Sequence, residues 1–126
     1  MDQGCFLINK DLKNQIPEVV ADKMVRPILT KNNLSVEEIN EWSIHQGGTA
    51  ILQRFGEEKI LGLSDKALER SQRLFNQYGN FSAPSCLFVL DSFFHNPEDG
   101  AKVGDRGTVV GFGAGYYLGM MIYTRE

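Results

Sequence analysis

Three short segments of the sequence carry residue types that could take part in chemistry. The first places His45 at the end of a predicted strand, just before the pair Gly47 and Gly48. Binding and catalytic residues of α/β proteins gather at the carboxyl ends of strands. An imidazole there can donate a hydrogen bond or exchange a proton near neutral pH. A histidine in such a loop can equally be a structural or capping residue, so this segment alone leaves both interpretations open.

The second and third segments add an amide and a glycine-rich loop. Asn80 follows Gly79 in a predicted turn before an apolar helix, where asparagine usually satisfies the backbone. The third segment is a run whose members are Gly111, Phe112, Gly113, Ala114 and Gly115. It is not followed by Lys-Ser or Lys-Thr, and a strand-like run comes next, so nucleotide binding is not predicted. A tight turn, or a backbone that passes close to a ligand, fits better.

The sequence offers no convincing nucleophile beside these groups. Cys5 lies in an apolar run that predicts a buried strand, and Cys86 lies in the first turn of an apolar helix. The helix dipole could lower the pKa of Cys86, but its neighbours Leu87 and Phe88 favour a buried structural thiol. The cysteines lack Cys-x-x-Cys spacing, which argues against a disulfide framework or a zinc site. No metal or redox cofactor is indicated.

The composition predicts one globular domain over residues 1–126. Apolar residues make up 42% of the 126 residues, which is enough for a core. The net charge of −3 argues against a nucleic-acid or membrane-surface partner. No run approaches the ~20 apolar residues of a membrane span, and the first residues lack the features of a signal peptide. The absence of these signals predicts a cytoplasmic location.

The hydrophobic pattern alternates strands with helices and ends in two adjacent strands. Apolar residues recur at helical spacing over residues 12–30, where Pro27 should kink the helix or end it early. The last two strands should form an antiparallel hairpin, and the whole pattern predicts an α/β fold with a mixed sheet. The remaining predicted elements are a strand at 5–8, a capping box at Ser35 and Glu38, a strand at 42–44, helices at 49–60 and 64–78, a helix from Pro84, and the hairpin strands at 107–112 and 116–123.

The helix that follows Pro84 is apolar nearly all round a helical wheel over residues 86–94. A helix of this kind must be covered on every side. It could be the central core helix of a compact domain. It could also be sandwiched between this chain and a second half, which the sequence favours because one small domain has little chain with which to cover it.

Taken together and in this order, the segments resemble the C-terminal half of the type III polyketide synthases, such as chalcone synthase, and of β-ketoacyl-carrier-protein synthase III. The run His-Pro-Gly-Gly-x-Ala-Ile-Leu of the first family is matched at residues 45–52, except that Gln46 replaces proline. The synthase III relatives carry His-Gln at that point. The sequence is therefore intermediate between the two at this motif.

Further motifs extend the resemblance over almost the whole chain. Tyr-Gly-Asn-x-Ser is matched at residues 78–82, Leu-Phe-x-Leu-Asp at 87–91, and Gly-Phe-Gly-x-Gly at 111–115. Near the start, Phe6, Lys10 and Asp11 resemble a Phe-x-Leu-x-Lys-Asp run, with Ile8 in place of leucine. Each motif is weak alone, and the ordered set is specific.

The resemblance implies the C-terminal half of a thiolase-like fold, with helices on both faces of a mixed sheet and the apolar helix buried against a second half. It implies a decarboxylative Claisen condensation of a malonyl thioester with an acyl thioester of coenzyme A or of an acyl carrier protein. His45 and Asn80 would be the catalytic donors that stabilise the enolate oxygen. The implied substrate-cavity residues are Phe6, Ser82, Gly111, Phe112, Gly113 and Gly115.

The nucleophilic cysteine of the family lies in an N-terminal half that this sequence lacks. We therefore expect the isolated chain to be inactive and the nucleophile to come from a partner subunit or from the rest of a longer protein. Two alternatives stay open: a non-catalytic interaction or assembly subunit that retains the fold, and a module that binds an acyl-pantetheine thioester without turnover. The apolar helix also predicts that the isolated chain forms a dimer.

Overall fold

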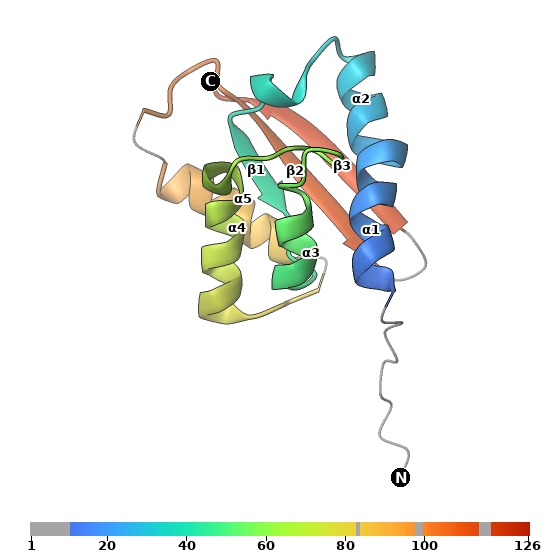
Figure 1. Cartoon of the computed structure of the whole chain (residues 1–126). Coiled ribbons are helices and arrows are strands. Elements are labelled where there is room, and N and C mark those ends of the chain that lie inside the picture. The colour runs from blue at the N-terminus through green and yellow to red at the C-terminus, as the bar shows by residue number, and fades with distance from the viewer. Residues whose placement is uncertain (1–10, 83, 98–99, 114–116) are drawn as a thin grey trace.

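Helices and strands alternate along the chain around one small sheet (Figure 1). The computed structural model describes residues 11–82, 84–97, 100–113 and 117–126, so the strand predicted at residues 5–8 lies outside the described residues. The helical segments are α1 (Leu12–Val20), η1 (Ala21–Val25), α2 (Arg26–Lys31), η2 (Val36–Glu38), α3 (Thr49–Arg54), α4 (Asp65–Tyr78) and α5 (Ser85–His95). The strands are β1 (Glu41–Ile44), β2 (Arg106–Gly113) and β3 (Tyr117–Thr124).

The three strands form a mixed sheet in the order β1-β2-β3. β1 runs parallel to β2, with Ile44 opposite Val110. β2 and β3 are antiparallel, with Gly113 opposite Tyr117 at the end of the pair. The predicted hairpin and the predicted mixed sheet are both confirmed. The carboxyl ends of β1 and β2 lie side by side because the two strands are parallel.

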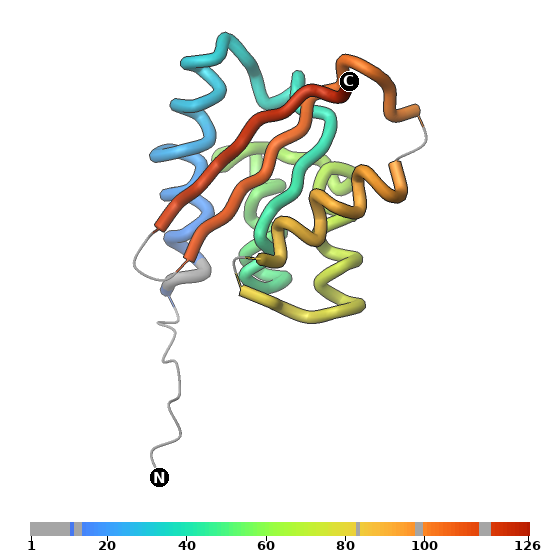
Figure 2. Tube along the Cα trace, turned by 180° about the vertical axis from the view of Figure 1, so that it is seen from behind, coloured from blue at the N-terminus to red at the C-terminus, as the bar shows by residue number. Residues whose placement is uncertain are grey.

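Helices cover both faces of this sheet, as predicted (Figures 1 and 2). The N-terminal helical segments and α3 pack on one face, α5 packs against β1 and β2 on the other, and α4 lies along β1. Successive side chains of a strand point to opposite faces. Trp42 and Ile44 therefore face the large core, whereas Ser43 faces the side of α5.

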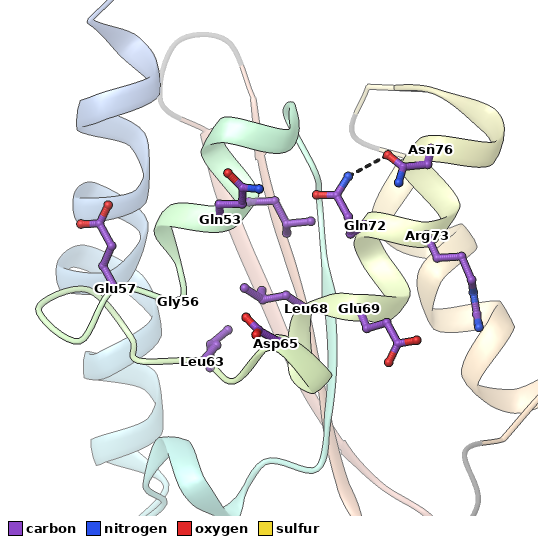
Figure 3. A pocket seen from close by; sticks show the side chains of 11 residues that line it. Gln53, Gly56, Glu57, Leu63, Asp65, Leu68, Glu69, Gln72, Arg73 and Asn76 are labelled. Carbon is purple, nitrogen blue, oxygen red and sulfur yellow. Dashed lines mark hydrogen bonds between the residues drawn. The ribbon is translucent and has the colours of Figure 1, made fainter.

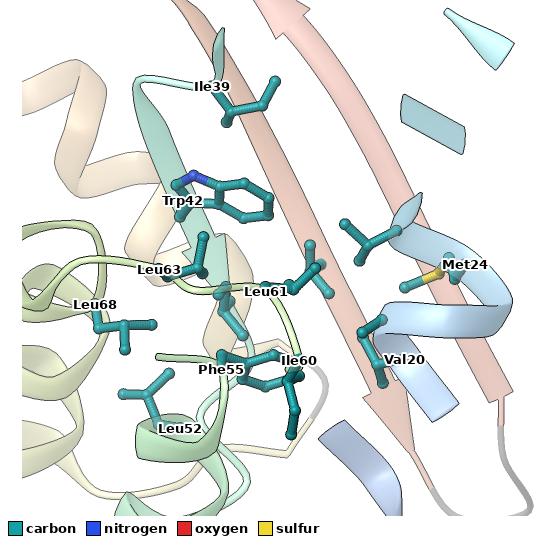
Figure 4. Close-up of a cluster of buried hydrophobic side chains, with 14 of the residues drawn as sticks. Val20, Met24, Ile39, Trp42, Leu52, Phe55, Ile60, Leu61, Leu63 and Leu68 are labelled. Carbon is teal, nitrogen blue, oxygen red and sulfur yellow. The ribbon is translucent and has the colours of Figure 1, made fainter. Parts of the chain in front are cut away.

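The main hydrophobic core lies between the sheet and the N-terminal helices (Figure 4). Trp42 and Ile44 of β1 pack there with Val110 and Phe112 of β2, and each of these side chains is almost fully buried. Helical and loop residues complete the cluster: Val20, Ala21, Met24, Val25, Leu29, Ile39, Leu52, Phe55, Ile60, Leu61, Leu63 and Leu68. The carboxyl ends of β1 and β2 are therefore anchored by packing against this core.

The first long helix continues past Pro27 instead of ending before it. Residues 12–31 are helical throughout, but Ala21–Val25 form a π-helical segment in which the Arg26 N–H bonds to the Ala21 carbonyl. Proline lacks the N–H that a regular helix would use at that position. Widened turns of this kind absorb a local mismatch within a helix. The predicted helix over residues 12–30 is therefore confirmed, and of the two outcomes expected at Pro27 the early end is wrong; the irregularity precedes the proline.

Local capping signals are confirmed where they were predicted. The Ser35 N–H bonds to a Glu38 carboxylate oxygen at 2.8 Å, and the hydroxyl of Ser64 accepts from the Ala67 N–H at 3.2 Å at the start of α4. The predicted helix at residues 49–60 is shorter than expected, because α3 ends at Arg54 and turns follow.

Helix α5 buries one side and exposes the other. Cys86, Val89 and Phe93 are buried against the sheet, whereas Leu87 and Phe88 are 55% and 54% exposed. Phe94 is also exposed, and so is Phe81 in the preceding loop, whose ring lies 5.4 Å from that of Phe88. The described chain therefore does not cover α5 on every side, and the prediction of a fully buried helix is not confirmed within it.

Polar side chains join β1 to the end of β3. Glu41 is buried, and its carboxylate accepts hydrogen bonds from Tyr123 Oη at 2.6 Å and Arg125 Nε at 2.5 Å. The Tyr123 ring fills the space beside Gly107, where an added Cβ would lie 2.1 Å from the ring. The hydrogen bond to Glu41 restricts the ring from moving away.

We expect Gly107→Ala to lower the free energy of unfolding by about 1–3 kcal/mol, because the new methyl group overlaps a fixed ring. Gly113→Ala is the matched control in the same strand, since an added Cβ there meets nothing within 4 Å. Urea denaturation of both variants checks the difference. An equal decrease in the free energy of unfolding of the two variants would contradict the proposed overlap with the Tyr123 ring.

Candidate condensing site

His45 lies directly after β1 and is held against β2. Its backbone N–H donates to the Val110 carbonyl at 2.8 Å. Its side chain is 6% exposed, and its ring centroid lies 4.9 Å from that of Phe112 at an interplanar angle of 56°. The position at the carboxyl end of a strand is the one that the sequence predicts.

Burial sets the charge of this imidazole. Desolvation lowers the pKa of His45 from its ordinary value of 6.5, because a buried ring cannot hold a charge as easily as one in water. The ring is therefore neutral near pH 7. A neutral imidazole still donates one N–H hydrogen bond and accepts one.

Several buried polar atoms at this end of β1 have no hydrogen-bond partner among the described residues. They are Ser43 Oγ, His45 Nδ1 and Gln46 Oε1. Buried polar groups are nearly always paired. Their usual partners are other protein groups or ordered water, so these three atoms are free to accept or donate further hydrogen bonds at this end of β1.

The predicted glycine turn follows His45. Gly47 has a φ of +58°, and a Cβ on it would lie 3.1 Å from the ring of Phe112. Gly48 has a φ of +138° and precedes α3. Residues other than glycine rarely adopt either of these backbone conformations. The two glycines let the chain leave the strand abruptly beside Phe112.

Asn80 lies in the loop between α4 and α5. Its side-chain oxygen accepts from the Ser82 N–H at 2.7 Å, and Ser82 has a φ of +62°. The Ser82 N–H is a donor, so the atom of the Asn80 carboxamide that faces it must be the oxygen. The NH₂ group of Asn80 is therefore the end of the amide that points away from its own turn. The residue is exposed in the described chain.

The two segments are connected through the start of α5. A Cβ added to Gly111, the neighbour of Val110, would lie 3.7 Å from Cys86 Sγ in the first turn of the helix. The hydroxyl of Ser85 accepts from the Phe81 N–H at 2.8 Å, directly after Asn80. The loop that holds Asn80 is thereby fixed at the same end of the sheet as the end of β1, as both views of the chain show (Figures 1 and 2).

The remaining predicted cavity residues are partly described. Gly111, Phe112 and Gly113 form the carboxyl end of β2, beside His45, and Ser82 lies in the Asn80 loop. Phe6 and Gly115 lie outside the described residues, so their predicted places stay predictions. Cys86 is buried, and burial raises the pKa of its thiol, as expected of a structural cysteine and not of a nucleophile.

One residue beside the site was not predicted from the sequence. Ser71 of α4 is fully buried, and its hydroxyl accepts from the Ile44 N–H at 3.3 Å. Its carbonyl accepts from Gln46 Nε2 at 3.2 Å. The helical pattern of residues 64–78 could have placed Ser71 on the inner face, but nothing local indicates which strand it meets.

A hollow formed by the described residues lies elsewhere. It has a volume of about 740 Å³ and opens between α3 and α4, where Gln53, Leu68, Glu69 and Gln72 line it (Figure 3). Neither His45 nor Asn80 lines this hollow. The candidate site is therefore separate from this hollow.

We expect acid to destabilise the chain through His45. The unfolded residue takes up a proton near pH 6.5, whereas the buried residue resists protonation until lower pH. Its contribution to stability is therefore present above pH 6.5 and is lost as the pH falls through the folded pKa. Urea unfolding of wild type and His45→Gln between about pH 7.5 and about pH 5.5, roughly one unit above and below the ordinary pKa, checks this. The free energy of unfolding should depend less steeply on pH in the variant than in wild type. An equally steep dependence in both would contradict this role of His45.

A family model described as "Chalcone and stilbene synthases, C-terminal domain" matches residues 3–124. The chain belongs to this family. The match confirms the resemblance seen in the motifs at His45 and Asn80, and it spans almost the whole sequence.

Relatives of this chalcone and stilbene synthase domain include type III polyketide synthases. Type III polyketide synthase B of Arabidopsis thaliana is 30% identical over 86% of this chain and 29% of its own length. The alpha-pyrone synthesis polyketide synthase-like protein Pks18 of Mycobacterium tuberculosis is 29% identical over 79% of this chain and 25% of its own length. A crystal structure of PKS-I from the brown alga Ectocarpus siliculosus shares the fold, with a TM-score of 0.80 at 24% identity over 94% of this chain and 32% of the alga's.

This synthase domain spans about a third or less of the length of the proteins that it matches. Among the described residues, no helix has both the length and the apolar character needed to cross a bilayer.

Proposed function

We propose that this domain supplies the His45 and Asn80 half of a site for decarboxylative Claisen condensation. The observation that carries the proposal is that His45 and the loop that holds Asn80 lie at the same end of the sheet. The Val110 carbonyl fixes the backbone of His45, and the Ser82 N–H fixes the oxygen of Asn80. Each side chain keeps an N–H that can be offered to a substrate oxygen.

The chemistry needs such donors. Loss of carbon dioxide from a malonyl thioester breaks a carbon–carbon bond, and the electron pair moves onto the thioester oxygen as an enolate. The enolate carbon then attacks an acyl thioester, a new carbon–carbon bond forms, and the thiolate leaves. Preorganised N–H donors stabilise the oxygen that carries the charge, and neither has to give up its proton.

The acyl group would be carried by a cysteine from outside the described chain. Cys86 is a poor candidate because burial raises the pKa of its thiol, and only the thiolate is strongly nucleophilic. The proposed substrates are acyl and malonyl thioesters of coenzyme A or an acyl carrier protein, with no metal or redox cofactor. Ser82, Gly111, Phe112 and Gly113 would line the acyl cavity, together with Phe6 and Gly115.

The exposed face of α5 supports the proposal of a second half. We define the α5 apolar surface as Leu87, Phe88 and Phe94 of α5 with Phe81 of the preceding loop. Several large apolar side chains exposed on one helix and its preceding loop are typical of an interface. It begins one residue after Asn80, so a partner that covers it would lie beside the loop that holds Asn80.

The proposal can be tested by supplying a cysteine-bearing N-terminal half. This chain, joined to or mixed with the cysteine-bearing N-terminal part of a type III polyketide synthase, should condense acyl and malonyl thioesters. The chain alone should gain no acyl mass. An acyl adduct on Cys86, or a well-formed complex that loads its cysteine but never condenses, would contradict the proposal.

The α5 apolar surface also favours a second candidate, a non-catalytic assembly subunit that binds an active partner. The same surface would let two copies of the chain form a dimer. Condensation that depends on His45 separates the first candidate from the second. Light scattering of the chain alone at micromolar concentration checks the dimer, and a stable monomer would exclude it.

A further inference from the structure

The backbone around His45 is fixed from two sides. On one side its N–H bonds to the Val110 carbonyl of β2 at 2.8 Å. On the other side both of its neighbours in sequence bond to a single residue of α4. The Ile44 N–H donates to Ser71 Oγ at 3.3 Å, and Gln46 Nε2 donates to the Ser71 carbonyl at 3.2 Å.

The bond from Ile44 to Ser71 replaces a backbone hydrogen bond that a further strand beside β1 would have made. In the described sheet β1 pairs only with β2, so the Ile44 N–H would otherwise be a buried donor without a partner, which is costly. The Ser71 hydroxyl satisfies it, and both residues are completely buried. A hydroxyl at this one place on α4 therefore holds the last residue of β1 before His45.

Gln46 holds the residue after His45. Its side chain is 2% exposed, and its amide must present nitrogen to Ser71 because a carbonyl oxygen can only accept. Gln46 occupies the place of a proline in the His-Pro-Gly-Gly motif that residues 45–48 resemble. A proline ring stiffens this loop through its fixed φ, whereas a glutamine leaves φ free. The buried hydrogen bond to α4 supplies a restraint that the missing ring would have given.

We infer that Ser71 and Gln46 are positioning residues that set the place of the His45 ring by fixing the backbone on either side of it. This inference rests on the proposed role of His45 and goes beyond it, because it assigns functional weight to α4, which touches neither substrate nor nucleophile in that proposal. The ring itself packs at a tilt against Phe112, which gives its position a measurable reference. Loss of either bond to Ser71 should let the ring move relative to Phe112.

NMR spectroscopy of the full 126-residue chain tests the inference. Gln46→Met keeps the size of the side chain and removes its hydrogen bond, and Ser71→Ala removes the hydroxyl. In each variant we expect the His45 amide to exchange its hydrogen about five- to tenfold faster, since one hydrogen bond near it is lost. The nuclear Overhauser contacts between the rings of His45 and Phe112 should weaken.

The controls separate a local effect from general loss of structure. Ser71→Thr keeps the hydroxyl, so the exchange rate of the His45 amide and the ring contacts between His45 and Phe112 should be as in wild type. Gln72→Leu removes a neighbouring glutamine of α4 that bonds to Thr49 and Asn76, and it should leave both signals as in wild type. Amides of β2 and β3 should exchange at their wild-type rates in every variant.

Unchanged exchange and unchanged ring contacts in both Gln46→Met and Ser71→Ala would overturn the inference. Faster exchange throughout the sheet would overturn it as well, because the two residues would then serve stability alone. These signals need no turnover, so they are independent of the proposed reaction. If His45→Ala leaves condensation intact in the joined enzyme, the proposed function fails; if His45→Ala is inactive and the NMR signals do not respond, this inference alone fails.

Discussion

Replacing His45 or Asn80 with alanine is expected to slow condensation by about 10²–10³-fold once the chain is joined to a cysteine-bearing half. The loss should appear in kcat, because in the proposed mechanism these donors stabilise charge that develops only as carbon dioxide leaves. Decarboxylation of a malonyl thioester, followed as released carbon dioxide, measures the step directly. The double variant should lose less than the product of the two single losses, since both donors serve one oxygen.

Matched controls for this prediction lie nearby. His95→Ala removes the other histidine, which sits at the exposed end of α5 beside Asp91. Asn76→Ala removes an exposed asparagine of α4 that bonds to Gln72. Both should decarboxylate at wild-type rates. Variants of His45 and Asn80 that assemble and turn over as fast as these controls would rule out the proposed roles.

The second large effect concerns the α5 apolar surface. Phe88→Asp is expected to weaken binding of a cysteine-bearing half by about 30-fold or more, because loss of a central aromatic contact at an interface typically costs 2 kcal/mol or more. The Phe88 side chain is 54% exposed, so the chain itself should fold normally. Titration of a labelled N-terminal half with wild-type and variant chain gives the two dissociation constants.

Val103→Asp is the control for this experiment. Val103 is an apolar residue that is 76% exposed, and it lies in the loop before β2 and outside the α5 apolar surface. It should bind like wild type. Equal loss of binding in the two variants would show that general charge, and not this surface, governs association.

Sequence patterns predict the elements of this fold well wherever the cause is local. The capping residues Ser35 and Ser64 are followed by helical turns, and the apolar runs of β2 and β3 pair as a hairpin. His45 falls directly after a strand because the apolar run ends there and glycines follow. These features depend on neighbours within a few residues, so one sequence is enough to find them.

Features that depend on distant contacts were missed or wrong. The helix predicted over residues 12–30 is present, but the π-helical segment before Pro27 follows from no simple periodicity. The role of Ser71 depends on Ile44 and Gln46, which are 27 and 25 residues away. The apolar character of α5 was predicted correctly, but periodicity cannot tell which of its sides this chain covers. Only the packing against β1 and β2 separates Val89 from Phe88.

The proposed convergence of His45 and Asn80 on one oxygen can be tested in a crystal structure of this chain joined to a cysteine-bearing half, with a bound acyl thioester. We expect a ring nitrogen of His45 and the Nδ2 of Asn80 each to lie about 2.7–3.1 Å from the thioester carbonyl oxygen. The account would be contradicted by a bound thioester whose oxygen takes its hydrogen bonds from other groups while either side chain points away.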